Sequence, residues 1–209
     1  MILEEIGVAL TKGQSNDVMA CVSKALEEGL TVREILNDGL LRAMSEIGVK
    51  FKNNEVFVPE VLIAARAMNA GLTILEPLLV DANIEPTGKV VLGTVKGDLH
   101  DIGKNLVAMM MKGAGFEVID LGVNVESSKF IDIAEEEKAD IICMSALLTT
   151  TMSNMKSVVE ELESRGLRDK YIVMIGGAPV TSQFANQIGA NAYTTDASSA
   201  AIKAKELVG

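Results

Sequence analysis

From residue 90 onward, short apolar runs alternate five times with amphipathic helical patterns. The apolar runs are short and lie between turn residues, as β-strands do, and the intervening segments repeat with a helical period. Alternating strands and helices fold into a parallel sheet with right-handed crossovers, so we predict a five-stranded Rossmann-like or flavodoxin-like α/β sheet. The predicted strands are 90–95, 117–121, 140–145, 171–175 and 191–194, and the predicted helices are 102–111, 128–137, 152–164, 181–188 and 198–208.

The N-terminal part of the sequence is helical throughout and predicts a four-helix bundle with short connections. Ser15 or Asn16 is expected to cap the second helix, a capping-box sequence at 31–34 to open the third, and Pro59 to open the fourth. A polar stretch with Pro and Gly then separates the helical pattern from the α/β pattern. The predicted organisation is a helical cap domain at 1–82, a linker at 83–88 and an α/β domain at 89–209.

The segment 96–105 follows the first predicted strand and contains His100, the only histidine of the chain. Open α/β sheets bind their ligands at the carboxyl ends of the strands, where this loop is expected to lie. Asp98 and Asp101 flank the histidine, so a carboxylate is available to hold one ring nitrogen while the other binds a metal. Gly97 and Gly103 permit close backbone approach or a positive φ.

Two other kinds of site are disfavoured at this loop. Gly97 to Lys104 has the spacing of a phosphate-binding loop, but Asn105 stands where Ser or Thr would bind magnesium, and two aspartates would repel a triphosphate. A zinc site needs three or four protein ligands, and one histidine without paired cysteines does not supply them. A metal held by this one nitrogen must bring its other ligands with it, as a macrocyclic cofactor does.

Three motifs of the α/β part together resemble those of cobalamin-binding domains. Asp98-x-His100-x-x-Gly103 is similar to the D-x-H-x-x-G signature of that family, Ser145-Ala146-Leu147 to its S-x-L, and Gly176-Gly177 to its G-G. They occur in the family's order, after the first, third and fourth predicted strands. Over nearly the whole chain, the sequence resembles the small corrinoid methyl-carrier proteins of methanogens and acetogens and the cap and cobalamin module of methionine synthase.

The resemblance implies a role for each matched residue. His100 would replace the dimethylbenzimidazole of cobalamin as the lower axial ligand of cobalt, Asp98 would accept a hydrogen bond from it, and Ser145 would extend this relay. Thr149 would face the displaced nucleotide tail, and the two glycines would let the cofactor pass close to the backbone. The cofactor-binding residues implied in the α/β domain are Asp98, His100, Asp101, Ile102, Gly103, Ser145, Leu147, Thr149, Gly176 and Gly177.

The cap carries a likeness of its own. The segment 51–61 resembles the loop and helix start that cover the upper face of cobalamin, and Phe51, Val58 and Val61 match the residues that shield the methyl–cobalt bond. A reactive organometallic bond needs a dry, apolar cover. The alternative is that these three side chains belong to the core of the helical bundle.

Composition limits the other partners. The net charge of −10 disfavours nucleic acid and anionic membranes, and aromatic residues make up only 3% of the chain, which disfavours base-stacking surfaces. Cys21 and Cys143 lie far apart in apolar patterns and are interpreted as free thiols. No uninterrupted apolar run approaches the length of a membrane span, and the N-terminus lacks a basic signal region, so we expect a cytoplasmic protein.

The resemblance implies a methyl-carrier subunit rather than a complete enzyme. It would bind cobalamin, or a related corrinoid, base-off with histidine on cobalt. It would shuttle a methyl group, as methylcob(III)alamin and cob(I)alamin, between a substrate-specific methyltransferase and an acceptor methyltransferase for a thiol or tetrahydrofolate. A reductive-activation protein stays open as a third partner, and methanol, methylamines, betaines and methoxylated aromatics stay open as donors. The alternatives are a cobalamin-dependent sensor or regulatory module, and a receiver-like domain with Asp98 or Asp101 as phospho-acceptor.

Overall fold

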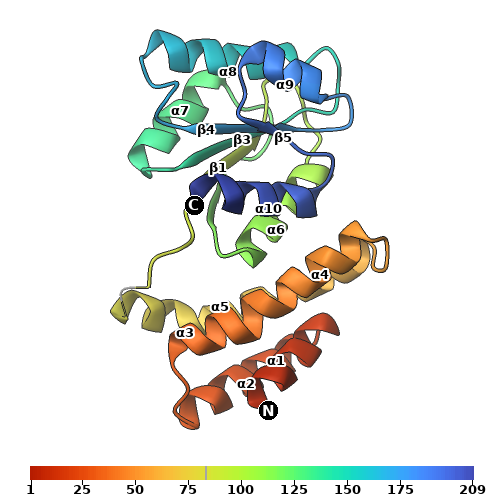
Figure 1. Ribbon diagram of the computed structural model, residues 1–209, viewed down its shortest axis with the longest axis vertical. Coiled ribbons are helices and arrows are strands. Elements are labelled where there is room, and N and C mark those ends of the chain that lie inside the picture. Colours follow the sequence, from red (N-terminus) through yellow and green to blue (C-terminus); the bar gives the residue numbers. More distant parts are fainter. Residues whose placement is uncertain (83) are drawn as a thin grey trace. The chain divides into compact units, whose positions relative to one another are not determined.

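The computed structural model describes residues 1–82 and 84–209, and the chain divides into two compact units. The first unit comprises Met1–Pro86 with Gly113–Gly115, and the second comprises Thr87–Lys112 with Phe116–Gly209. Of the predicted linker at 83–88, Asn83 lies outside the described residues. Each unit is described by itself below (Figure 1).

The first unit is helical, as predicted, and its longest helix packs against the others. Its elements are α1 (Ile2–Thr11), α2 (Ser15–Glu27), α3 (Val32–Glu34), the π-helix η1 (Ile35–Leu41), α4 (Arg42–Lys52) and α5 (Val58–Asp81). α3, η1 and α4 follow one another without a break, so they correspond to the third of the four predicted helices. Helix α5 contacts α1, α2 and α4. Ile6, Leu10, Val22, Leu40 and Met68 are among the side chains buried in this unit.

Local signals explain where most of these helices begin and end. The capping box is present, because the Thr31 hydroxyl accepts from the Glu34 amide at 3.2 Å and the Glu34 carboxylate accepts from the Thr31 amide at 2.9 Å. The prediction for the second helix was wrong by a residue or two: α2 already begins at Ser15, after Gln14. The N-cap residue is Gln14, which makes no side-chain capping hydrogen bond, and Gly13, with φ +70°, forms the tight turn before it.

One stretch of α5, Val58–Leu79, is long and apolar enough to cross a membrane by length and composition alone. It is also the helix on which the other cap helices pack, and Val61, Ala64, Met68 and Leu75 along it are buried in the folded chain. A buried core helix satisfies the same length and composition criteria as a membrane span.

The second unit is a five-stranded parallel sheet, which confirms the predicted fold. The strands β1 (Lys89–Thr94), β2 (Glu117–Asp120), β3 (Ile141–Ser145), β4 (Ile172–Gly176) and β5 (Ala192–Tyr193) lie in the order β2-β1-β3-β4-β5. This is the flavodoxin-like order, in which the switch point between β1 and β3 is the usual ligand-binding position. The helices are α6 (Ile102–Gly113), α7 (Ser127–Glu136), α8 (Ser153–Ser164), α9 (Ser182–Ile188) and α10 (Ala197–Val208).

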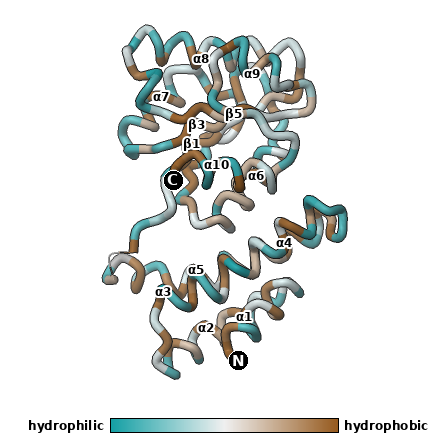
Figure 2. The backbone as a smooth tube through the Cα atoms, in the orientation of Figure 1, coloured by the Kyte–Doolittle hydropathy of each residue, from teal (hydrophilic) through white to brown (hydrophobic). Residues whose placement is uncertain are grey.

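Helices cover both faces of this sheet, with α7, α8 and α9 on one side and α6 and α10 on the other (Figure 1). The central strands are accordingly apolar along their length (Figure 2), as expected for strands buried on both faces. Thr94 pairs in register with Ser145, and Ser145 with Gly176. The three predicted motifs therefore leave the sheet side by side at one edge.

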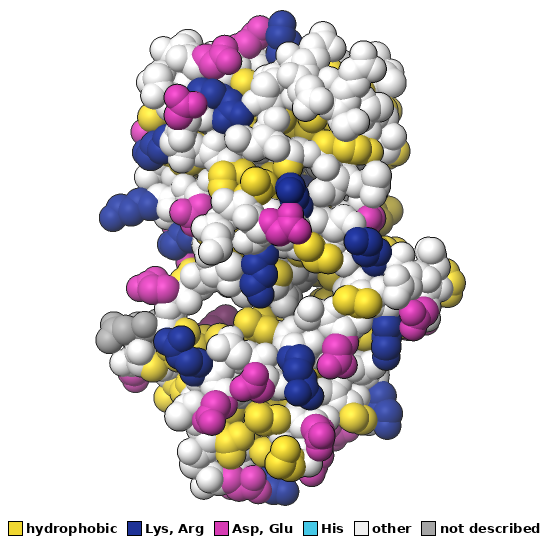
Figure 3. Space-filling model, viewed as in Figure 1, with side chains coloured by type: hydrophobic (Ala, Val, Ile, Leu, Met, Phe, Trp, Pro, Cys, Tyr) yellow, Lys and Arg dark blue, Asp and Glu magenta, His cyan; other side chains and the backbone are white. Residues whose placement is uncertain are grey.

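The surface charge is mixed on the face that Figure 3 shows, where basic and acidic side chains alternate on both units. Several of them are paired, such as Arg165 with Asp132 and Lys156 with Glu160. The net charge of −10 does not form a single acidic patch on this face.

Candidate functional site

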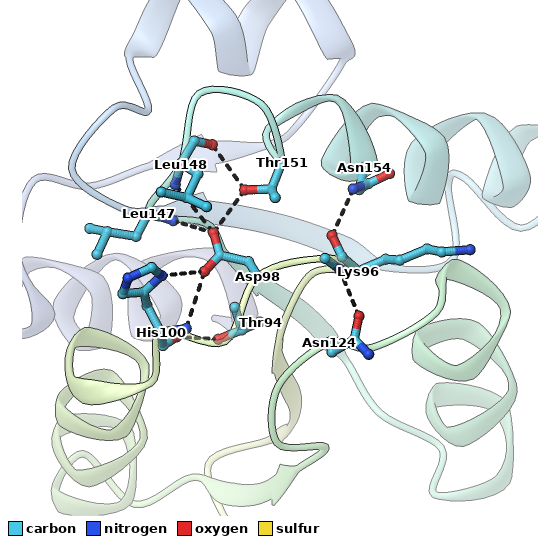
Figure 4. Close-up of polar contacts among 10 residues, drawn as sticks. Thr94, Lys96, Asp98, His100, Asn124, Leu147, Leu148, Thr151 and Asn154 are labelled. Carbon is cyan, nitrogen blue, oxygen red and sulfur yellow. Dashed lines mark hydrogen bonds and ion pairs between the residues drawn. The ribbon is translucent and has the colours of Figure 1, made fainter.

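The centre of the site is the Asp98 carboxylate, which is fully buried and accepts five hydrogen bonds (Figure 4). Oδ1 lies 2.7 Å from His100 Nδ1 and 3.1 Å from the His100 amide. Oδ2 accepts from the Leu147 amide at 2.8 Å, the Leu148 amide at 3.2 Å and the Thr151 hydroxyl at 2.7 Å. One carboxylate thereby joins the loop after β1 to the loop after β3.

This arrangement keeps Asp98 ionised. Burial by itself would raise the pKa of the Asp98 carboxyl, but the hydrogen bonds from His100, Thr151 and Leu147 act in the opposite direction and prevail. The pKa of Asp98 therefore lies well below its ordinary value. Such a carboxylate is too enclosed to serve as a phospho-acceptor, which argues against the receiver-like alternative at this residue.

The ionised carboxylate fixes the tautomer of His100. A carboxylate only accepts hydrogen bonds, so the proton of the bond to Asp98 belongs to Nδ1 of the imidazole. Nε2 has no hydrogen-bond partner among the described residues, and the histidine side chain is 50% exposed. A neutral imidazole held in this way presents one lone pair in a fixed direction, as a metal ligand does.

The backbone of the histidine loop is held by side chains from three other segments (Figure 4). The Thr94 hydroxyl donates to the His100 carbonyl at 2.9 Å, and the Asn154 amide nitrogen donates to the Lys96 carbonyl at 2.7 Å. The Asn124 side-chain oxygen accepts from the Gly97 amide at 2.7 Å, and the Asn124 amide donates to the Asp98 carbonyl at 3.0 Å. None of these three supporting residues was predicted, because no local spacing connects them to the motif.

The surroundings of His100 are apolar and exposed. Leu99 and Ile102 are 71% and 78% exposed, and Leu147 and Leu148, whose amides bind Asp98, are 43% and 42% exposed. Among the described residues, no group of three or more His, Cys, Asp or Glu side chains is placed to hold a metal ion. A metal at Nε2 therefore has to arrive with its own ligands, and the exposed leucines and isoleucine suit a large ring with apolar faces.

Comparison with known proteins decides between the candidate ligands. Residues 88–202 match a family described as B12 binding domain, and residues 2–76 match a second family with the same description. The dimethylamine corrinoid protein of Methanosarcina barkeri is 46% identical over 208 residues, which cover 99% of this chain and 97% of that protein. The chain belongs to the B12-binding family of corrinoid proteins. Its cofactor is accordingly a cobalamin or related corrinoid, as predicted.

Two solved structures resemble this corrinoid protein over its whole length. A chain of the methanol:cobalamin methyltransferase complex MtaBC from Methanosarcina barkeri superimposes with a TM-score of 0.91 at 28% identity, covering 99% of this chain and 79% of that one. A cobalamin-binding protein from Desulfitobacterium hafniense DCB-2 gives a TM-score of 0.80 at 30% identity, covering 99% and 98%. The helical unit and the sheet are therefore both features of the family.

One predicted relay of the corrinoid protein needs correction. The hydroxyl that donates to Asp98 is that of Thr151, not that of Ser145. After Ser145, the last residue of β3, the chain turns through residues 147 and 148, whose amides donate to the Asp98 carboxylate. The hydroxyl that reaches this carboxylate comes from beyond that turn. The sequence signal for this hydroxyl is the run of three threonines at 149–151. Thr149, which was predicted to face the nucleotide tail, is exposed.

The two motif glycines at the end of β4 and directly after it are glycines for different reasons. A Cβ on Gly177, which has φ +131°, would lie 1.8 Å from the Ala146 carbonyl oxygen, so the fold itself requires glycine there. A Cβ on Gly176 would meet only the Thr194 carbonyl oxygen, at 3.9 Å. Gly103, at the start of α6, would have no atom within 4 Å of an added Cβ, so protein packing does not explain the choice of glycine.

The remaining predicted residues lie at the surface of the loop or in the cap. Asp101 is exposed, and its carboxylate accepts from the Asn105 side chain at 3.1 Å. Phe51 near the end of α4 and Val58 at the start of α5 are half-buried, whereas Val61 is fully buried.

Proposed function

We propose that this corrinoid protein binds cobalamin base-off, with His100 Nε2 as the lower axial ligand of cobalt, and carries a methyl group between two methyltransferases. The observation that supports the proposal most is the chain's single histidine, held at Nδ1 by a buried carboxylate and exposed at Nε2. When bound, the cobalt would supply a centre that accepts, holds and releases the methyl group, and the protein would supply position and shielding.

The chain's own residues would act through the histidine. Asp98 sets the ring direction, and the donors from Leu147, Leu148 and Thr151 keep this carboxylate in place and charged. With its Nδ1 proton directed at Asp98, the ring would keep the lone pair of Nε2 free for the metal.

Other predicted residues would frame the cofactor. Ile102 and Gly103, which follow His100 closely in the chain, and Leu147, whose amide shares Asp98 with the histidine, would meet the lower face of the ring. Thr149 and Gly176 would border the displaced nucleotide tail, at the ends of β3 and β4. Phe51 and Val58 of the cap, which are half-buried, would shield the upper face, where an apolar cover excludes water from the reactive bond. Val61 is fully buried and belongs to the core of the helical unit, the alternative that its position in the sequence also allowed.

The partners follow from the relatives. A chain of similar fold belongs to a methanol:cobalamin methyltransferase complex, and the more similar relative is named a dimethylamine corrinoid protein. We infer that the donor-side partner is a substrate-specific methyltransferase, with methylated amines favoured by the full-length 46% identity. The acceptor side would be a cytoplasmic methyltransferase for a thiol or tetrahydrofolate.

The visible spectrum after reconstitution with hydroxocobalamin and desalting tests the proposal. Wild-type protein is expected to retain one corrinoid with its benzimidazole displaced. His100→Ala is expected to bind at least ~10–100-fold more weakly, the loss typical even of an outer-shell partner, and to lack a nitrogen ligand from the protein. Identical affinities and spectra for the two proteins would contradict the assignment, and a colourless wild type would contradict cobalamin binding altogether.

Gly103→Ala separates a cofactor contact from a structural requirement. Apart from its chain neighbours and its own helix backbone, no described atom lies within 4 Å of the added methyl group, and the site is in the first turn of α6, so the substitution should stabilise the cofactor-free protein by about 0.4–1 kcal/mol. If the corrin ring passes over Gly103, the same methyl group should weaken cobalamin binding. A Gly103→Ala protein that binds cobalamin as well as wild type would remove Gly103 from the site.

A further inference from the structure

Lys104 is a buried lysine that the ligation scheme above does not use. Its side chain is only 2% exposed, although lysines are almost never buried without a partner. Its Nζ lies 2.5 Å from Asp120 Oδ2 and 2.7 Å from Asn105 Oδ1. An ammonium removed from water needs such partners, because an unpaired buried charge is strongly destabilising.

Through Asp120, the ammonium is connected to one support of the histidine loop. Asp120 is the last residue of β2, and its other oxygen accepts from the Gly122 amide at 2.9 Å. The Gly122 carbonyl in turn accepts from the Thr94 amide at 3.0 Å. Two residues later, Asn124 holds the backbone of Gly97 and Asp98. The position of the segment after β2, and with it of Asn124, thus depends on Asp120.

Through Asn105, the same ammonium is connected to the other end of the loop. The Asn105 side chain donates to the Asp101 carboxylate at 3.1 Å, and the Asn105 amide donates to the Asp101 carbonyl at 2.7 Å. Asp101 directly follows His100. Lys104 Nζ is therefore bonded both to Asp120, which leads to the support before the histidine, and to Asn105, which leads to the residue after it.

We propose that Lys104 and Asp120 are a positioning pair that sets the direction of His100 toward cobalt; this rests on the proposed ligation by His100. Among the described residues, the polar partners of Lys104 and Asp120 do not include the histidine. Their effect passes through Asn124, Gly122 and Asn105, which fix the backbone on which Asp98 and His100 stand. The lysine in the Gly97-to-Lys104 pattern, whose spacing resembles a phosphate-binding loop, is accounted for by this internal pair.

The exposures of the two partners are unequal, 2% for Lys104 and 40% for Asp120, and this makes the two single variants informative. In Lys104→Met the remaining carboxylate can be hydrated, whereas in Asp120→Asn the ammonium stays buried without its counter-charge. Asp120→Asn should therefore lower the thermal stability of the cofactor-free protein more than Lys104→Met. Both should loosen the histidine loop to a similar extent, and the double variant should add little, because the two groups act as a unit.

The test uses the full chain in two measurements. Protein produced with ¹⁵N-labelled histidine, loaded with unlabelled cobalamin and reduced to the cob(II) state, is examined by EPR, where the ¹⁵N splitting reports the fraction of cobalt with the axial nitrogen of the single histidine. Cofactor-free protein is examined by hydrogen exchange at the Gly97 and Asn124 amides. Lys112→Met, an exposed lysine of the same helix α6, is the matched control.

Lys104→Met and Asp120→Asn are expected to lower the nitrogen-ligated fraction several-fold and to speed exchange of both amides at temperatures where the proteins are folded, while Lys112→Met changes neither. Lower stability with wild-type ligation and exchange would overturn the proposal and leave a merely structural pair. If wild-type protein shows no axial nitrogen from the protein, the proposed ligation by His100 fails. In that case, amide exchange in the two variants as slow as in wild type would also overturn the positioning role. Faster exchange in the variants would uphold the role for the loop alone.

Discussion

Replacing Asp98 by asparagine is expected to destabilise the cofactor-free protein by about 3–5 kcal/mol, the range for breaking a buried charged network. The carboxylate accepts backbone hydrogen bonds on both oxygens, from the His100 amide on one side and the Leu147 and Leu148 amides on the other. Whichever way the asparagine amide turns, its NH₂ group faces a backbone donor that cannot change its role. The lost bonds are also those that hold the two motif loops together.

Tyrosine fluorescence during urea unfolding measures this effect in the α/β unit alone. The chain has no tryptophan, and its two tyrosines, Tyr171 and Tyr193, both belong to that unit. Asp101→Asn is the matched control, since this carboxylate lies in the same loop but is exposed, and its stability should stay within about 0.5 kcal/mol of wild type. Equal stabilities for Asp98→Asn and wild type would show that the network does not hold the loops.

The same difference should depend on pH in a defined direction. The pKa of Asp98 is lowered in the folded protein from its ordinary value of 3.8, so its contribution is fully present above that value and is lost as the pH falls toward the folded pKa. The gap in unfolding free energy between wild type and Asp98→Asn should be constant near neutral pH and shrink below pH 3.8. A gap that grew on acidification would mean that the carboxyl is not held ionised.

Gly177→Ala is expected to destabilise the α/β unit by more than about 4 kcal/mol, or to prevent its folding, which is an exceptional effect for one methyl group. The added Cβ would overlap the Ala146 carbonyl oxygen at 1.8 Å, and φ of +131° excludes an alanine on its own account. Neither backbone can retreat easily, because the Ala146 amide is bonded to the Gly176 carbonyl at 3.2 Å. Moving Ala146 would also displace the Leu147 amide from Asp98.

Gly176→Ala provides the comparison for this prediction. The nearest atom to its added Cβ is 3.9 Å away, an ordinary contact, so the same urea titration should show a loss of no more than about 1 kcal/mol. Equal effects of the two neighbouring substitutions would contradict the account of Gly177 as a glycine that the sheet edge requires.

The sheet and the pairing of Asp98 with His100 were predictable because their sequence signals are local. Strand–helix alternation prescribes a parallel sheet, and parallel strands bring the ends of β1, β3 and β4 to one edge. Asp98 and His100 are two residues apart, so a turn of the chain is enough to bring carboxylate and ring together. No long-range information was needed for either conclusion.

The other partners of Asp98 depend on the tertiary fold and were missed for that reason. Thr151 is far from Asp98 in sequence, and the choice of Ser145 in its place followed a motif rather than the path of the chain after β3. Asn124 and Asn154 support the loop from other segments, and single asparagines carry no spacing signal. The burial of Lys104 was missed for the same reason, since Lys104 lies in α6 and its partner Asp120 belongs to a separate element, strand β2.

Within the cap, the helix periods predicted the elements but not their irregularity. The π-helix at Ile35–Leu41 continues the apolar pattern of its neighbours, and Gly39 within it lies buried, with Ile6 of α1 3.5 Å from the position of its missing Cβ. A π-helix bonds residue i to i+5, whereas an α-helix bonds i to i+4, so the two patterns differ by one residue. The hydrophobic periodicity of a sequence does not resolve so small a difference.

The most direct test of the central claim uses the fact that His100 is the only histidine. Protein produced with ¹⁵N-labelled histidine and loaded with unlabelled cobalamin is reduced to the cob(II) state, and its EPR spectrum is compared with that of unlabelled protein. If His100 Nε2 is the axial ligand, the nitrogen splitting changes from the ¹⁴N to the ¹⁵N pattern. A splitting that stays ¹⁴N would assign the axial position to the cofactor's own benzimidazole and contradict the claim, as would a spectrum without nitrogen splitting.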